Sequence, residues 1–139
     1  MKSLIPLLLL CIAAGSPLAH AEQCAMDTVT ESSMRLSGYL RSQAASSFRV
    51  RCGQAYNIRF SSMNLVSSNG DSYVRNGAFR LATRMRIEGA NKNEWNALLS
   101  PRTAGRDNKF AVVVELEETP TVSTPAGIYR DVVYVSLAF

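Results

Sequence analysis

The sequence predicts an all-β sandwich, and three observations support this fold class. Apolar and polar residues alternate with a period of two in several short segments, as in half-buried strands. Clusters of turn-forming residues separate these segments. No stretch of a dozen residues has the periodicity of an amphipathic helix. Short strands joined by turns are typical of a β-sandwich.

The alternation predicts five clear strands. Two of them lie within residues 46–63, on either side of a bend at Gly53, and they are followed by strands at 79–88, 110–116 and 128–139. Segments 26–30 and 34–40 are weaker candidates. Asn69-Gly70 supplies the residues that a tight hairpin needs before the strand at 79. The polar stretch 89–107 is expected to form a loop or a short helical turn around Trp95, interpreted as a buried plug.

Length and composition are those of one folded domain. The chain has 139 residues, 47% of them hydrophobic and 19% charged, which excludes disordered, collagen-like and coiled-coil classes. Its formal net charge of +4 favours solubility and acidic partners. We expect no nucleic acid among the partners, because the chain carries an export signal.

Residues 1–21 are typical of a secretory signal peptide. Lys2 precedes an apolar run at residues 4–14, and Ala19-His20-Ala21 has the small-x-small pattern of a cleavage site. The run is shorter than the about 20 residues that span a bilayer. Cleavage after Ala21 leaves a domain at residues 22–139 and removes the single histidine.

Cleavage also leaves two cysteines, Cys24 and Cys52. An even pair in an oxidising compartment predicts one disulfide, although two free thiols are the alternative. The disulfide would close a loop of roughly 28 residues and stabilise the fold by about 3 kcal/mol.

The alternation in the last predicted strand continues to the carboxyl-terminal residue. Its apolar face consists of Tyr129, Val133, Val135, Leu137 and Phe139. An immunoglobulin-like sandwich has about seven strands, more than the clear ones here, so we expect one partner strand to be missing. The last strand would then leave an apolar groove and unpaired backbone groups. Alternatively, it pairs with two neighbours and simply ends.

Two segments of the chain resemble chaperone–usher pilus subunits, most closely the archaic type with the spore coat protein U domain. At the end of the chain, Gly127, Tyr129 and Asp131 lead into alternating apolar residues and a final aromatic residue. Residues 48–60 are similar to the family's second-strand cysteine and the strand after it, with Cys24 in the position of the early partner cysteine. Residues 64–108 match no motif of the family.

This resemblance implies an incomplete immunoglobulin-like sandwich of Greek-key type, which lacks its final strand and is completed by a donated strand. The implied partners are a periplasmic chaperone, an outer-membrane usher and a neighbouring pilus subunit, and the implied location is a fimbria on the bacterial surface. The implied groove contains the apolar face of the last strand, and the chaperone would hold the terminal carboxylate of Phe139 with basic residues.

The amino-terminal segment departs from the family's pattern. Members that polymerise carry a donor segment before the first cysteine, whereas only Glu22 and Gln23 separate the predicted cleavage site from Cys24. We therefore expect a tip or minor subunit, an adhesin or invasin. A shaft subunit is the first alternative and requires earlier cleavage. A self-contained secreted or periplasmic β-sandwich binding module is the second.

Enzymatic functions have little support in the sequence. Without His20, His-based nucleophile pairs and His-bearing metal sites are missing. No phosphate-binding glycine loop or calcium loop occurs, and we expect no metal or cofactor. A hydrolase with an Asp or Glu nucleophile is the remaining enzymatic alternative.

Arg80, Arg84 and Arg86 project from one face of the strand predicted at 79–88. Arginine pairs well with carboxylate and sulfate groups, so this face is a candidate receptor site for a sialylated or sulfated glycan or an acidic protein surface. Alternatively, the arginines only solvate an outward face and discourage edge pairing. Tyr129 is a candidate tyrosine-corner residue, or else only a core residue.

Overall fold

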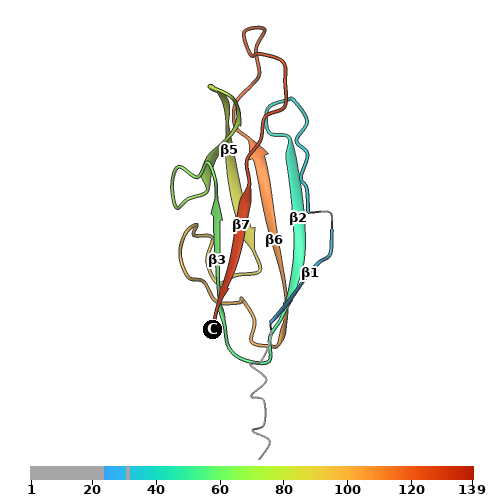
Figure 1. The fold of residues 1–139 in the computed structure, drawn as a ribbon, viewed down its shortest axis with the longest axis vertical. Helices are drawn as coiled ribbons and strands as arrows, with labels where there is room; N and C mark the ends of the chain where they lie inside the picture. The colour runs from blue at the N-terminus through green and yellow to red at the C-terminus, as the bar shows by residue number, and fades with distance from the viewer. Residues whose placement is uncertain (1–23, 31) are drawn as a thin grey trace, which may run out of the picture.

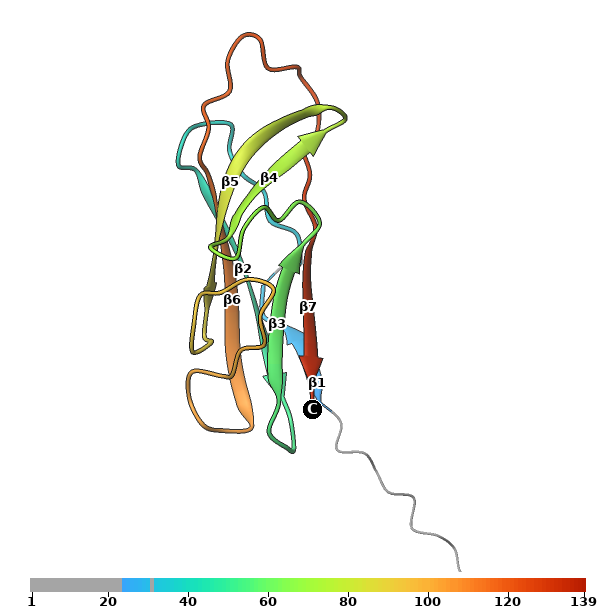
Figure 2. The ribbon, with the colours of Figure 1, turned by 90° about the vertical axis from the view of Figure 1, so that its left-hand side faces the viewer.

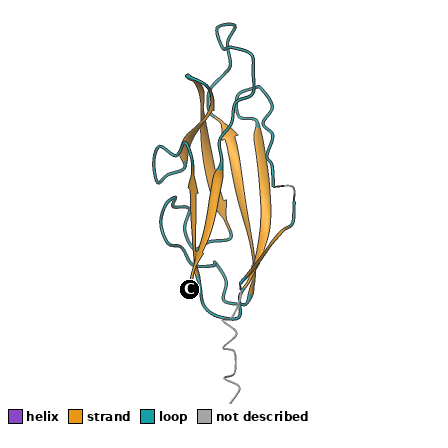
Figure 3. Cartoon of the chain, viewed as in Figure 1, coloured by secondary structure: helices purple, strands orange, loops and turns teal. Residues whose placement is uncertain are grey.

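The computed structural model describes residues 24–30 and 32–139, so the predicted signal peptide lies outside the described residues. The described residues form seven β-strands and no helix (Figure 3). In chain order, the strands are β1 (Ala25–Thr28), β2 (Gln43–Arg51), β3 (Asn57–Ser62), β4 (Asp71–Asn76), β5 (Phe79–Glu88), β6 (Asp107–Leu116) and β7 (Val133–Ala138). Within these ranges, no helix has the length and hydropathy of a membrane span.

The strands form two antiparallel sheets that face each other (Figures 1 and 2). The large sheet has the order β1-β2-β6-β5-β4, and the small sheet consists of β3 and β7. When β4 is set aside as an added edge strand, this is the A-B-E-D and C-F arrangement of a constant-type immunoglobulin sandwich. The predicted fold class is therefore confirmed. In the described chain, no strand fills the position of the seventh immunoglobulin strand, G, beside β7.

The core lies between the two sheets and is centred on aromatic residues. Phe48 of β2 and Phe110 of β6 are cross-strand partners with ring centroids 5.6 Å apart. Phe60 of β3 contacts both rings from the small sheet and meets Trp95 edge-on at 6.1 Å. Trp95 is 1% exposed, so its predicted role as a buried plug is confirmed.

The predicted disulfide between Cys24 and Cys52 is present, with the two Cα atoms 4.2 Å apart. It extends the β1–β2 ladder by one position, because Ala25 and Arg51 are the adjacent cross-strand partners. The bond therefore fixes the edge strand β1 to the rest of the large sheet.

Strand β4 was not among the predicted strands. Ser72 occupies an inward position of β4 and is 4% exposed, so a polar residue interrupts the alternation that marks other strands. The hairpin prediction at Asn69-Gly70 is also wrong, because this turn leads into β4. The two-residue hairpin lies between β4 and β5, where Gly77 has a φ of 59° at the first central position, as in a type II′ turn.

The last strand is shorter than predicted, because residues 128–132 bend before β7 begins. Arg130 exchanges two backbone hydrogen bonds of 2.9 Å with Arg75 of β4. The next residue, Asp131, accepts hydrogen bonds from the backbone N–H groups of Asn64 at 3.0 Å and Val132 at 2.8 Å. These contacts set the point at which the chain enters the small sheet. The weak candidate at 34–40 and the stretch 89–106 contain no strand or helix.

Candidate functional site

Strand β7 pairs on one side only. Its residues run antiparallel to β3 in a register that extends from Ser62 opposite Val133 to Asn57 opposite Ala138. No strand of the described chain pairs with the other side of β7. In Figure 1, β7 lies in front of β6, with β3 beside it.

The pairing pattern shows which backbone groups face the unpaired side. The N–H of Met63 donates to the carbonyl of Val132 at 2.8 Å. Hydrogen-bonded and non-bonded positions alternate in an antiparallel ladder, so Tyr134 and Ser136 bond to β3. The N–H and C=O groups of the alternate residues point away from β3. We call these residues the open edge of β7; they are Val133, Val135 and Leu137.

The same three residues direct their side chains to the core. They are half-buried and pack against the core cluster from one side. Their neighbour Tyr134 lies on the outward face and is 52% exposed. The open edge therefore offers both unpaired backbone groups and incompletely covered apolar side chains.

Two further core-facing residues, Met34 and Leu36, were not among the predicted site residues. Both are half-buried and pack against the same core, between the exposed Arg35 and Ser37. Residues 32–36 make no backbone hydrogen bond to another described residue. The alternation at 34–40 was the sequence signal for these two residues. It indicated that the segment faces the core, but not that it lacks a partner strand.

Two of the predicted groove residues do not belong to the open edge. The Tyr129 hydroxyl donates to the carbonyl of Pro125 at 2.8 Å, which confirms a tyrosine corner and uses this side chain before β7 begins. Phe139 follows the last residue of β7 and is 67% exposed. The structure therefore brings Val133, Val135 and Leu137 together and leaves Tyr129 and Phe139 outside the group.

The open edge is electrically neutral, since β7 contains no charged residue. Ionisable groups with shifted pKa values lie elsewhere. Burial raises the pKa of Tyr56, although a hydrogen bond from Asn108 to its hydroxyl, 3.1 Å long, opposes this effect. The hydrogen bond from Arg51 to Asp27 and the attraction between their charges raise the pKa of the exposed Arg51.

The arginine face of β5 is largely paired within the chain. Arg84 forms an ion pair with Asp71 at 3.2 Å, and Arg86 forms one with Glu88 at 3.1 Å. The Arg80 guanidinium lies over the ring of Tyr73, 5.0 Å from its centroid. Two of the three predicted receptor residues therefore already have carboxylate partners.

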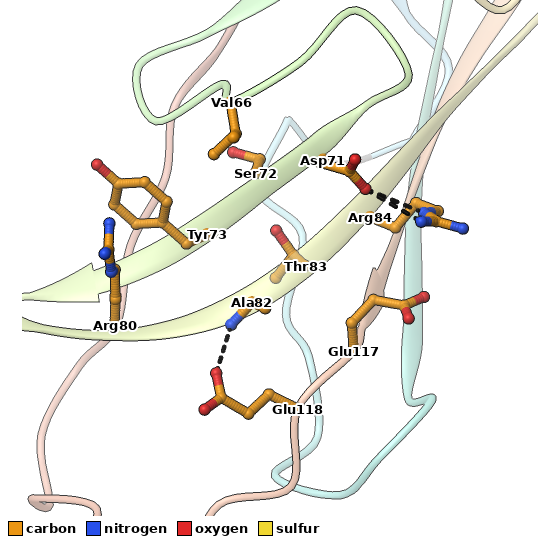
Figure 4. A pocket seen from close by; sticks show the side chains of 10 residues that line it. All are labelled: Val66, Asp71, Ser72, Tyr73, Arg80, Ala82, Thr83, Arg84, Glu117 and Glu118. Atoms are coloured by element: carbon orange, nitrogen blue, oxygen red, sulfur yellow. Dashed lines mark hydrogen bonds and ion pairs between the residues drawn. The ribbon is translucent and has the colours of Figure 1, made fainter.

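A shallow pocket of about 400 Å³ lies beside these arginines (Figure 4). Arg80 and Arg84 line it together with Glu117 and Glu118, and the Glu118 carboxylate accepts a hydrogen bond from the N–H of Ala82 at 2.9 Å. Because charges of both signs line the pocket, it does not select for an anion. Among residues 24–30 and 32–139, no group of three His, Cys, Asp or Glu residues is arranged to hold a metal ion.

Among the comparisons with known proteins, the comparison with solved structures gives a match. No protein-family model matches the sequence, and no curated protein matches it. A similar solved structure is the crystal structure of the E. coli Hda pilus minor tip subunit, HdaB. It is 12% identical, the match covers 84% of this chain and 82% of that chain, and the TM-score is 0.44. No conclusion about this chain rests on that likeness.

Proposed function

We propose that this chain is a non-enzymatic structural subunit of a bacterial surface fimbria and that it accepts a strand from another polypeptide. The open edge of β7 carries this proposal, because it lies where an immunoglobulin sandwich has its strand G. The resemblance of residues 126–139 to the end of pilus subunits supports the same function.

An extended segment suits this edge for two physical reasons. Its backbone would pair with the free N–H and C=O groups of Val133, Val135 and Leu137, and its alternate side chains would cover theirs. Full burial stabilises a Val or Leu side chain by about 1.5–3 kcal/mol relative to exposure. Three partly buried side chains would therefore gain at most about 3 kcal/mol in total on completion.

The proposed partners follow from strand acceptance. A periplasmic chaperone would occupy the open edge during export, and a neighbouring subunit would replace it in the fibre after passage through an outer-membrane usher. A tip or minor position, as an adhesin or invasin, is the finer form of this proposal. The intact mass of the exported protein tests it: a mature start at Glu22 supports a tip position, and a start at or before Leu18 contradicts it.

Amide hydrogen exchange tests strand acceptance directly. In the full-length chain we expect fast exchange at Val133, Val135 and Leu137, and slow exchange at Tyr134 and Ser136, because the latter donate to β3. A synthetic peptide of about 13 residues with alternating apolar side chains should slow exchange at the open edge and raise the unfolding temperature.

A peptide of the same composition with its apolar residues out of alternation is the matched control and should do neither. Leu137→Asp should abolish the response to the alternating peptide, whereas Ser136→Asp on the outward face should preserve it. A cooperatively folded monomer with slow exchange at all five residues and no response to either peptide would instead indicate a self-contained module.

A further inference from the structure

Three arginines lie side by side across adjacent segments near the β4–β5 hairpin. Arg75 and Arg80 are cross-strand partners, and Arg130 pairs with Arg75 on its other side. Residues directly opposite each other in a ladder project from the same face. All three arginines are exposed. We call this group the arginine row: Arg80, Arg75 and Arg130.

The backbone pairing brings these side chains close together. Because Arg75 exchanges both of its backbone hydrogen bonds with Arg130, it faces Arg80 in a non-hydrogen-bonded position. Cα atoms in such pairs are about 4.5 Å apart, and side chains approach more closely than in the hydrogen-bonded pairs. Like charges directly opposite each other destabilise a sheet.

The same face of the β4–β5 ladder also shows a compensated charge pair. Asp71 lies opposite Arg84 and forms an ion pair with it. By contrast, no member of the arginine row forms an ion pair with a carboxylate of the described residues. Arg80 is held over Tyr73, which limits its freedom before any ligand binds. The row therefore holds three positive charges without an ion-pair partner among the described residues, although Glu117 and Glu118 line the pocket beside Arg80.

We infer that the arginine row binds a sulfated glycan chain. Guanidinium groups bind oxyanions through paired hydrogen bonds, and adjacent groups suit a ligand that carries several such anions. Exposed apolar residues flank the row in sequence, namely Phe79, Ile128 and Val132, but the row itself presents guanidinium groups, and Arg80 covers the ring of Tyr73. The centre of a protein interface is instead depleted of charged residues. Figure 2 shows the end of the β4–β5 hairpin far from the carboxyl terminus. The row shares no residue with the open edge, although Arg130 lies three residues before Val133.

Heparin is a suitable probe, because it carries closely spaced sulfates. Calorimetric titration of the full-length chain should show binding that weakens as salt is added. The variant R75Q/R80Q/R130Q should bind at least a hundredfold more weakly, since each charged hydrogen-bonding contact is worth about tenfold or more. The single variant Arg75→Gln should lose about tenfold.

The control variant R35Q/R59Q/R102Q removes the same charge from exposed arginines that form no ion pair with a described residue. It should change heparin affinity by less than about fivefold, as expected for screened, distant charges. The row variant should also unfold at an equal or higher temperature, because like-charge repulsion is removed.

Three results would overturn the inference. The first is an absence of heparin binding by the wild-type chain. The second is an equal loss of affinity in both triple variants, which would indicate only general attraction. The third is polyglutamate binding as tight as heparin binding and lost in the row variant, which would assign the row to an acidic protein segment.

Discussion

Strands β3 and β7 are partners in one ladder, yet the structure covers them very differently. Ile58 and Phe60 of β3 are both 0% exposed, whereas Leu137, directly opposite Ile58, is only half-buried. The far side of β3 is also occupied, since Ile58 and Leu99 exchange backbone hydrogen bonds of 2.8 Å and Asn96 donates to Phe60 at 2.7 Å. The far side of β7 has no such partner among the described residues.

This difference shows that two properties of a strand are set separately: which face is apolar, and how far that face is buried. Alternation decides which face of a strand is apolar, and it does so equally for β3 and β7. The extent to which that face is buried depends on what lies beside the strand. Leu137 is therefore an apolar residue on a face that the described chain buries only in part.

The largest expected effect comes from substituting the opposite residues Ile58 and Leu137. Ile58→Ala should lower the free energy of unfolding by about 4 kcal/mol, as for a fully buried aliphatic side chain. Leu137→Ala should cost about 1 kcal/mol, because its side chain is only partly buried. Urea denaturation measures both. Equal costs would show that Leu137 is fully covered in solution and would remove the contrast between the strands.

The next effect concerns the carboxylate that fixes the start of β7. Asp131 accepts hydrogen bonds from the Ser72 hydroxyl and from two backbone N–H groups, including that of Asn64. Asp131→Asn should cost about 2 kcal/mol, since bonds to charged acceptors are the stronger ones. As a control, Asp107→Asn breaks an exposed ion pair with Arg49 and should cost under about 1 kcal/mol in the same urea titration.

Removing the tyrosine corner should have a smaller effect. Tyr129→Phe deletes the hydroxyl that donates to Pro125 and should lower thermal stability by about 1 kcal/mol. Tyr134→Phe removes an exposed hydroxyl from β7 and should change stability by less than about 0.5 kcal/mol. If the two variants behave alike in calorimetry, the corner does not help to position β7.

The smallest effect is a pH dependence at the entrance to β3. Burial raises the pKa of Tyr56 above its ordinary value of about 10, so the unfolded chain loses this proton first as the pH rises. The resulting stabilisation is fully present below about pH 10 and is lost as the pH rises through the folded-state pKa. Between roughly pH 9 and 11, the unfolding temperature should therefore fall less steeply with pH in Tyr56→Phe than in the wild-type chain.

The sequence predicted those features that depend on local alternation. It located most of β2, β3, β5 and β6, and it also identified the pairing of Cys24 with Cys52. It did not predict β4, because the buried Ser72 is held by hydrogen bonds, donating one to Asp131 and sharing one with the hydroxyl of Ser62 in β3, rather than by apolar contact.

For the candidate site, the sequence indicated Val133, Val135 and Leu137 but not their register. The position of Arg130 beside Arg75 depends on how the segment before β7 meets β4, and no local pattern records that contact. The pairing of Arg84 with Asp71 likewise depends on the β4–β5 register. Sequence reasoning therefore placed the possible receptor site on arginines that are in part neutralised.

Because of the hydrogen bonds of Asp131, the beginning of β7 is held more firmly than its end. Its carboxylate reaches Ser72 in the large sheet and the N–H of Asn64 just after β3, so both layers hold the strand where it begins. At the opposite end, Phe139 is mostly in solvent. Thermal fraying should therefore start at Ala138 and proceed toward Val133. A donated strand, as proposed above, would pair most stably beside the end of β7 near Val133.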